Sequence, residues 1–458
     1  MKTMERKSFF AVCIMAFSML AAPTTNAKVK DIPVMETGGQ PMPNEWIDKD
    51  TGHRVMKLTR REGSNRSFYF HNNPFINSKE MVFVGTDVRQ ASTDMRHNST
   101  AGTVKQMYAV NLKSLKIRQI TNEKHGVSTE IVCPKTQEIF FQHGDSIFCV
   151  SAKPGKSGSK RLVATLPKGR TGGIACVNCD GTRLAGTFNN PEEARILREH
   201  PKKSDFFNLI YNAKLEKTIF VIDVATGTFE NVWTDNAWLN HLQFSPTDPN
   251  RLLFCHEGPW HKVDRIWNID VRNAEELAAA GLSGKAVRQP VLMHKRTLFI
   301  DEYVDAQGKR HYGEIAGHEW FGAKGKYLYF DLQKPRGETF FVGKVNLETL
   351  EEEDFELTRD EWAVHFTTSW DETFLVGDGG SPSSVAHSDK DQWIYRYDYQ
   401  KDANGNLSHT LRTEKLVNMK NHDYSLEPNV HMSPDQKWVI FRANFEGYDN
   451  VYAVELKK

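Results

Sequence analysis

The chain has 458 residues and a formal net charge of +1, from 59 lysines and arginines and 58 aspartates and glutamates. This balance excludes the strongly basic surface with which many proteins hold nucleic acid by its phosphates. Aromatic residues make up 11% of the chain, which is enough apolar volume for a substantial core. We therefore expect a globular protein without a nucleic-acid partner.

The first 27 residues look like a targeting signal rather than part of the fold. The basic residues of this segment are Lys2, Arg6 and Lys7. Residues 9–22 are apolar but too short to cross a bilayer comfortably, and the small residues ending at Ala27 offer a cleavage position. We expect an exported protein, periplasmic or secreted, with residues 1–27 as signal peptide. Residues 28–45 then form an N-terminal extension, and the mature chain has no membrane span.

From residue 46 onward the chain repeats one pattern: an apolar run, a turn with Asp, Asn or Gly, and a second run. The clearest examples are residues 72–85, 176–186, 242–258, 320–331, 366–379 and 430–444. Alternation of apolar and polar residues on both sides of such turns is typical of antiparallel hairpins. Helical patterns are short and comprise residues 273–281 and the charged segment 191–205, which we expect to form a surface helix or a lid.

Repeats of roughly 45–75 residues with about four strands each are typical of propeller blades. Inner strands are expected to begin near residues 71, 129, 173, 241, 318, 365 and 429. Residues 53–59 look like an outer strand, and the final strand at 451–456 lacks one after it. We predict an all-β fold, a seven-bladed β-propeller over residues 46–458, in which residues 53–59 close the ring beside 451–456.

Four histidines lie where inner strands are expected to begin: His71, His241, His318 and His365. The inner strands of a propeller start at one face of the central channel, so these side chains should converge on one funnel. A single histidine in such a place is more often structural. Four at equivalent positions favour a functional site.

The segments 254–271, 317–330, 365–379 and 427–447 resemble the oligogalacturonate lyase family. They carry "CHEGP", "HEW" and "VGDG" in that order, and the similarity runs from about Trp46 to the end of the chain. The resemblance implies a seven-bladed propeller that cleaves short pectic oligosaccharides by β-elimination with a bound Mn²⁺-like ion.

The resemblance also implies roles for single residues. His318 would be the base, Arg265 would face the substrate, and His365 would be the first metal ligand. The other family ligands are a Gln and two His, and their positions are taken here by Tyr424, Glu427 and Asn429. Oxygen donors suit Ca²⁺ or Mg²⁺ better than Mn²⁺. The altered positions therefore predict a weakened Mn²⁺ site, a Ca²⁺ site or no metal.

β-Elimination from a uronate requires a base and a cationic group close to each other. It removes the C5 proton of a uronate, which is poorly acidic while the neighbouring carboxylate keeps its full charge. A metal ion or the planar fork of an arginine takes up that charge, and a neutral imidazole suits the base. His318, Arg265 and a cationic site near His365 thus form a coherent set.

Four further residues are expected to bind substrate: His256, His71, His241 and Trp320. A tryptophan such as Trp320 is more often core between blades, and His256 would equally serve as part of a loop. The leading prediction is an exported polysaccharide lyase that acts on uronate-containing oligosaccharides.

Two alternatives stay open. One is a glycoside hydrolase that uses the same funnel on a uronate-bearing glycan, and the other is a non-catalytic propeller that binds glycan or protein. The altered ligand positions favour these alternatives, whereas His318 with Arg265 favours an enzyme over a non-catalytic propeller. Fold alone does not choose among them.

Overall fold

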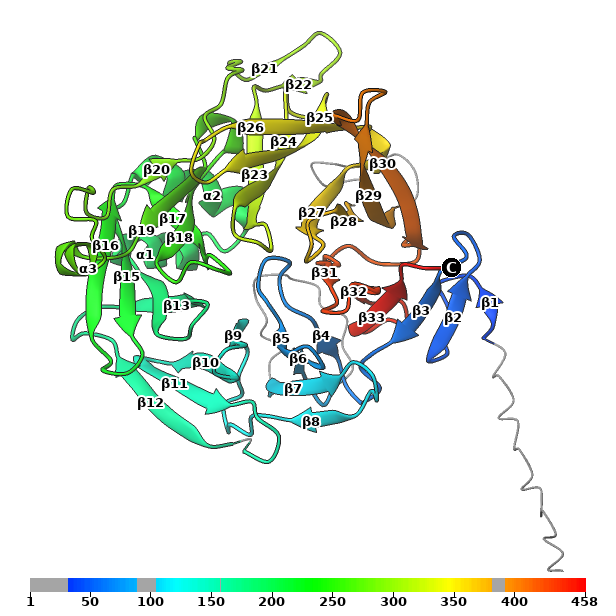
Figure 1. The fold of residues 1–458 in the computed structure, drawn as a ribbon, viewed down its shortest axis with the longest axis horizontal. Coiled ribbons are helices and arrows are strands. Elements are labelled where there is room, and N and C mark those ends of the chain that lie inside the picture. Colours follow the sequence, from blue (N-terminus) through cyan, green and yellow to red (C-terminus); the bar gives the residue numbers. More distant parts are fainter. Residues whose placement is uncertain (1–31, 89–103, 157, 381–391) are drawn as a thin grey trace, which may run out of the picture. The chain divides into compact units, whose positions relative to one another are not determined.

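Both ends of the folded chain meet in one sheet. The structure is a computed structural model that describes residues 32–88, 104–156, 158–380 and 392–458, so the predicted signal peptide lies outside the described residues. The strands of this sheet, in spatial order, are β1 (Val34–Met35), β2 (Glu45–Asp48), β3 (Arg54–Lys57), β33 (Asn450–Glu455), β32 (Trp438–Ala443) and β31 (His431–Met432). β3 runs antiparallel to β33 (Figure 1), which confirms the predicted pairing of residues 53–59 with 451–456.

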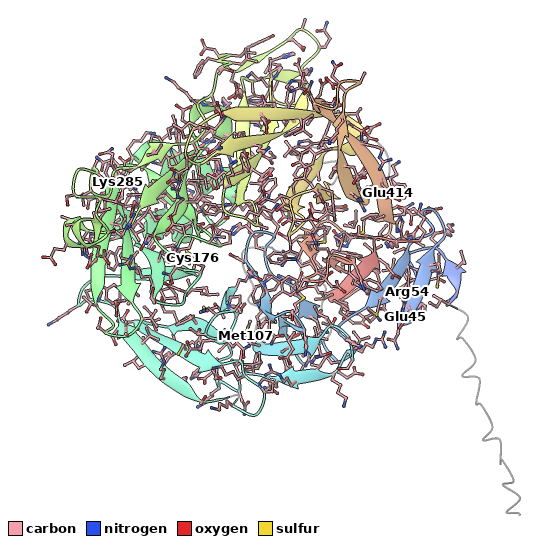
Figure 2. The ribbon with its side chains drawn as sticks, viewed as in Figure 1. Glu45, Arg54, Met107, Cys176, Lys285 and Glu414 are labelled. Atoms are coloured by element: carbon pink, nitrogen blue, oxygen red, sulfur yellow. The ribbon has the colours of Figure 1, made fainter. Side chains whose placement is uncertain are left out.

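The N-terminal strands are fastened to this sheet by polar contacts around a buried tryptophan. Trp46 is fully buried, and its Nε1 donates a hydrogen bond to Thr37 Oγ1 over 2.8 Å. Across β2 and β3, Arg54 Nη2 lies 2.8 Å from Glu45 Oε2, and both side chains are labelled in Figure 2. The sheet therefore begins at Val34, upstream of residue 46.

Four sheets follow in chain order. The first holds β4 (Asn65–Arg66), β5 (Phe75–Asn77), β6 (Glu80–Gly85), β7 (Gln106–Asn111) and β8 (Ile117–Gln119). The second holds β9 (Ile131–Cys133), β10 (Glu138–His143), β11 (Ser146–Ser151) and β12 (Lys160–Thr165). The third holds β13 (Gly172–Val177), β14 (Arg183–Phe188), β15 (Lys217–Asp223) and β16 (Phe229–Asp235). The fourth holds β17 (Trp238–Phe244), β18 (Arg251–Glu257), β19 (Ile266–Asp270) and β20 (Val291–Leu292).

The last large sheet consists of two antiparallel halves. One half holds β23 (Ile315–Phe321), β24 (Tyr327–Gln333), β25 (Phe340–Asn346) and β26 (Glu352–Leu357). The other holds β27 (Ala363–Thr368), β28 (Phe374–Gly379), β29 (Trp393–Lys401) and β30 (Leu407–Asn418). The halves meet where Glu356 of β26 pairs in parallel with Thr410 of β30. A small hairpin, β21 (Tyr303–Val304) and β22 (Arg310–His311), precedes them.

Within residues 33–458 the sheets follow one another around a centre, as Figure 1 shows. Contacts link the innermost strands in turn, from β5 to β9, β9 to β13, β13 to β17, β23 to β27 and β27 to β31. The described chain is therefore an all-β, propeller-like fold. This arrangement brings the innermost strand of each sheet to the central channel, where sequence analysis expected the histidines.

Helices are confined to connections between strands. α1 (Pro191–Glu199) and α2 (Lys203–Ala213) lie between β14 and β15, and α3 (Ala274–Ala279) follows β19. Short 3-10 turns are η1 (Trp260–Lys262) and η2 (Arg359–Glu361). The predicted helix in residues 191–205 is thus the start of a helix pair. Among the described residues, none of the helices is both long and apolar enough to cross a bilayer.

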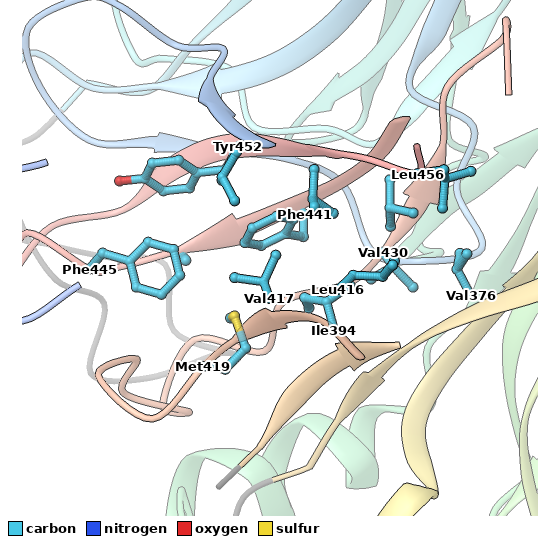
Figure 3. Packing of buried hydrophobic residues seen from close by; sticks show 14 of the residues in the cluster. Val376, Ile394, Leu416, Val417, Met419, Val430, Phe441, Phe445, Tyr452 and Leu456 are labelled. Atoms are coloured by element: carbon cyan, nitrogen blue, oxygen red, sulfur yellow. The ribbon is translucent and has the colours of Figure 1, made fainter. Parts of the chain in front are cut away.

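Apolar side chains fill the space between neighbouring sheets. In the cluster of Figure 3, Val376 and Ile394 from β28 and β29 meet Phe441 and Tyr452 from β32 and β33. None of these four side chains is exposed. Close packing between sheet faces of this kind fixes the tilt of each sheet against the next. It thereby holds the inner strands in place around the channel.

Candidate active site

Three residues at or next to the inner strands have a strained backbone, and two of them lie in β-bulges. The pairing of β17 with β18 shifts register at His241, and that of β23 with β24 shifts at His318. These residues have φ values of 51° and 42°, and Asn429, just before β31, has 50°. A positive φ is uncommon for residues other than glycine, and such strain and bulges concentrate at functional sites. Three sheets thus share one feature, a residue other than glycine with a positive φ in or just before the inner strand.

His318 is oriented by a buried carboxylate. Its Nδ1 lies 2.7 Å from Oδ2 of Asp331, on the neighbouring strand β24, and the Asp331 side chain is only 2% exposed. A hydrogen bond from Nδ1–H to this carboxylate leaves the lone pair on Nε2. The imidazole packs against the rings of Trp260 and His365, with centroids 5.0 and 4.8 Å away. An imidazole held in one tautomer by a carboxylate is suited to accept a proton.

Arg265 lies in a buried clamp of two glutamates. Its Nη1 donates to Glu257 Oε1 over 2.7 Å, and its Nε donates to Glu319 Oε2 over 3.0 Å. The guanidinium stacks 5.0 Å from the centre of the Trp260 ring. Nη2 has no hydrogen-bond partner among the described residues. Burial acts to raise the pKa of Glu257, but Arg265 and His241 outweigh it and bring the value to about 2.

His241 faces the same two glutamates. Its Nδ1 is 3.6 Å from Glu319 Oε1 and its Nε2 is 3.9 Å from Glu257 Oε2, both longer than a hydrogen bond. Burial, helped by Arg265, lowers the pKa of His241 to about 3, so the ring is neutral at physiological pH. The ring of His71 lies 5.9 Å away, and its Nδ1 is buried without a partner among the described residues.

His365 lies at the predicted metal position. It is completely buried, with Nδ1 3.1 Å from Asp378 Oδ2 and Nε2 3.6 Å from Glu427 Oε2. Burial acts to lower the pKa of His365, but Asp378 and Glu427 outweigh it and the net shift is upward. Nε2 has no hydrogen-bond partner among the described residues, so it is available to a ligand.

The other predicted ligands are engaged in different ways. Asn429 Oδ1 accepts a hydrogen bond from the Phe70 N–H over 2.9 Å, and its amide donates to the Glu427 carbonyl over 3.0 Å. The hydroxyl of Tyr424 is buried without a partner in the described chain. Besides the Tyr424 hydroxyl, a poor metal ligand, His365 and Glu427 therefore offer two free donors. This is fewer than the four ligands that the family resemblance implies and fewer than the three protein ligands of a catalytic zinc site. Within the described ranges no three His, Cys, Asp or Glu residues gather as a ligand set, so this arrangement does not fit the family's metal.

Two predicted substrate contacts lie elsewhere. The His256 ring stacks on Trp267, 5.0 Å away, with its Nε2 3.6 Å from Asp235 Oδ2. Successive side chains on a strand point to opposite faces, so His256 points away from Glu257 and the clamp. Trp320 is 2% exposed and stacks on Phe366 with 9° between the ring planes. This packing agrees with the core role that sequence analysis also allowed, and Trp320 lines a cavity together with His71 as well.

Several residues of this centre were not predicted: Tyr69, Glu319, Asp331 and Asp378. Glu319 follows His318 in an "HE" pair that also occurs at His256 and Glu257, and this repeated pair was an available signal. Asp331 and Asp378 end the apolar runs of β24 and β28, a shared position visible only once the strands are aligned. Nothing in the sequence around Tyr69 marks it.

Comparison with known proteins places these residues in a family. Residues 44–280, over half of the chain, match the family model of oligogalacturonate lyase. An oligogalacturonide lyase of Pectobacterium atrosepticum is 22% identical over 432 residues, which cover 90% of this chain and 95% of that protein. An oligogalacturonate lyase of Dickeya dadantii is 24% identical over 301 residues, 62% of this chain and 66% of that protein.

Solved structures share the fold. An oligogalacturonate lyase in complex with manganese superposes with a TM-score of 0.67 and 20% identity, over 93% of this chain and 99% of its own. An oligogalacturonate lyase from Vibrio parahaemolyticus superposes with a TM-score of 0.66 and 20% identity, over 90% of this chain and 96% of its own. The likeness extends over nearly the whole of each chain, so the arrangement of sheets around the funnel is common to all three.

Proposed function

The chain belongs to the oligogalacturonate lyase family, and on that basis we propose that it cleaves uronate-containing, pectic oligosaccharides by β-elimination. The observation that carries this proposal is the placement of a carboxylate-oriented imidazole and a guanidinium against one ring. His318 packs on Trp260, and Arg265 stacks over the same indole. With this arrangement the base can take the C5 proton of a sugar while the cation binds the carboxylate of the same sugar.

Each residue then has a defined task. His318 Nε2 takes the C5 proton, and Asp331 stabilises the imidazolium that forms. The free Nη2 of Arg265 donates to the substrate carboxylate as charge moves onto it. The electrons of the C5–H bond form the C4=C5 double bond while the bond from C4 to the glycosidic oxygen breaks. The clamp of Glu257 and Glu319 holds the guanidinium in position for this step.

The metal site of the family is proposed to be weakened or replaced in this chain. His365 alone keeps its ligand type, and the Asn429 oxygen is already bonded to the Phe70 N–H. The free carboxylate oxygen of Glu427 suits Ca²⁺ or Mg²⁺ better than Mn²⁺. We expect elemental analysis of protein purified without chelator to find no transition metal at one ion per chain. A stoichiometric transition metal that survives dialysis would contradict this.

Two wider features belong to the same proposal. If the halves of the eight-stranded sheet are counted separately, the sheets of the described residues, leaving aside the hairpin β21–β22, number seven. This supports a seven-bladed propeller. Export is supported by the pattern of residues 1–27 and is tested by fractionating cells and sequencing the N-terminus of the mature protein.

The test of function is product chemistry. Purified protein incubated with oligogalacturonides should generate an ultraviolet-absorbing unsaturated uronate, and the product masses should sum to that of the substrate. A hydrolase would instead add one water and leave no double bond. Unchanged substrate that is nevertheless bound would favour the non-catalytic propeller. Either result would overturn the lyase proposal.

A further inference from the structure

Tyr69 lies in the centre of the funnel without a task in the reaction as described. It belongs to the segment between β4 and β5, and its ring meets the imidazoles of His71, His241 and His365 edge-on, with centroids 4.9, 6.0 and 5.2 Å away. The residue is half-buried, and its hydroxyl has no hydrogen-bond partner among the described residues. A phenol placed among three histidines with a free hydroxyl is available to substrate.

The backbone around Tyr69 is held from two neighbouring sheets. Its N–H donates to Glu130 Oε2 over 2.8 Å, just before β9, and the next N–H, of Phe70, donates to Asn429 Oδ1 over 2.9 Å, just before β31. Glu130 also accepts a bond from the Asn72 amide over 2.7 Å. Side chains placed by such supporting bonds are positioned well enough for chemistry.

The proposed reaction needs a second proton transfer. When the bond from C4 to oxygen breaks, the departing oxygen is a poorly stable alkoxide unless it receives a proton. His318 is occupied with the C5 proton and is tied to Asp331. Tyr69 contacts His365, and His365 contacts His318 with ring centroids 4.8 Å apart, so the phenol lies one ring away from the base. A phenol is protonated at neutral pH and can serve as a general acid.

We propose that Tyr69 is a catalytic residue that protonates the departing glycosidic oxygen. This inference rests on the proposed lyase function. The phenolic O–H bond breaks as the bond from C4 to oxygen breaks, and the proton ends on the new hydroxyl of the leaving sugar. His318 holds the C5 proton, and the phenolate regains a proton from solvent as the imidazolium loses one. No atom or electron is left unaccounted for, and no oxidant or co-reactant is required.

The experiment compares two leaving groups in the Tyr69→Phe variant. On oligogalacturonides, kcat should fall by about 10²–10⁴, the usual worth of a general acid, with KM and melting temperature near those of the unaltered protein. A synthetic uronate with a nitrophenyl group on O4 loses nitrophenolate, which leaves without a proton. The variant should cleave that substrate at close to the rate of the unaltered protein.

A matched control is Tyr303→Phe, on the outer hairpin, where the tyrosine is 51% exposed and stacks on His311. It should change neither rate. The proposal is overturned if Tyr69→Phe keeps its kcat on oligogalacturonides, or if both substrates slow equally. If the unaltered protein forms no unsaturated product from either substrate, the lyase function fails first and the role of Tyr69 fails with it.

Discussion

At the scale of single residues, His318 is constrained at both its backbone and its ring. Its φ of 42° turns it out of the regular pleat of β23, and Asp331 fixes the imidazole. The preceding Gly317 lets Trp260 approach closely, since a Cβ there would come within 2.7 Å of the indole. A strained backbone maintained by this much surrounding structure is expected where geometry serves function.

Replacing the base gives the first test at this scale. His318→Ala should lower turnover on oligogalacturonides by about 10²–10⁴, because the C5 proton loses its acceptor. The melting temperature should stay close to that of the unaltered protein, since the ring is partly exposed and leaves no large cavity. Turnover and melting should be measured on one sample.

The control for this variant is His409→Ala, an exposed histidine on β30. It should leave both turnover and melting unchanged. A His318→Ala protein that melts lower but keeps normal activity per folded molecule would show that the histidine is structural.

Sequence reasoning located the funnel histidines but not their partners. His241 and His318 were found because a strand start can be recognised from turn residues and apolar alternation. The partner Asp331 depends on the register of β23 against β24, and the bulge at His318 changes that register. A shift of one residue moves every side chain to the other face, so the pairing is not visible in the sequence. Tyr69 lies in a segment with no strand pattern and was missed for that reason.

At the scale of elements, the long connection from β20 to β23 is tethered by one buried histidine. His294 Nδ1 lies 2.8 Å from Glu352 Oε2, and its Nε2 lies 2.8 Å from Glu314 Oε1. Glu314 also accepts the N–H groups of Thr297 and Leu298 over 2.8 and 3.0 Å. These contacts join the connection to β26. They therefore fix the position of the segment that leads into β23, the strand that carries His318.

This tether predicts a pH dependence of stability. Burial acts to lower the pKa of His294, but the hydrogen bonds that its ring donates to Glu314 and Glu352 raise it to about 9. The charged histidine therefore stabilises the fold fully below its unfolded pKa of about 6.5, and that stabilisation is lost as pH rises through about 9. The free energy of unfolding in urea should fall between about pH 6.5 and 9.5.

The matched variant is His294→Gln, which keeps polar contacts but cannot carry the charge. Its unfolding free energy should be lower than that of the unaltered protein at the acid end and nearly equal to it at the alkaline end. An unchanged pH dependence in the variant would assign the effect to other groups.

The helix pair shows where sequence reasoning stops at this scale. The charged residues of α1 were recognised, but α2 was not, because the predicted charged segment ends at residue 205 and the apolar residues of α2 follow it. Phe206 and Ile210 are four apart and share one face, and Phe206 meets the Trp238 ring 6.3 Å away. Burial against another sheet, rather than helical propensity, stabilises such a short helix. The partner, Trp238 of β17, lies beyond two further strands in the chain, so the sequence of α2 alone does not reveal it.

At the scale of the whole molecule, the N-terminal strand β3 completes a sheet made by the C-terminus. Leu58 N–H donates to the Val451 carbonyl over 2.9 Å, so these two residues form a hydrogen-bonded pair. Val55 and Val454 face each other three positions away. Hydrogen-bonded and non-hydrogen-bonded pairs alternate along an antiparallel ladder, so these two valines form a non-hydrogen-bonded pair, in which the side chains are closer. Neither valine is exposed. Closing the sheet this way removes an open strand edge.

A disulfide at this pair tests ring closure. In the double variant Val55→Cys and Val454→Cys, the closer pair type brings the Cα atoms to about 4.5 Å, within the range that a disulfide spans. We expect the bond to form in the folded protein under mild oxidation, and peptide mass mapping should identify it. Because the cross-link closes a loop of nearly the whole folded chain, the chain-entropy relation gives a gain of about 6 kcal/mol in stability. The same sample after reduction is the control, since only the cross-link differs. If the two cysteines stay unlinked in the folded protein, or if oxidised and reduced forms melt together, the two strands do not close the ring as the structure describes.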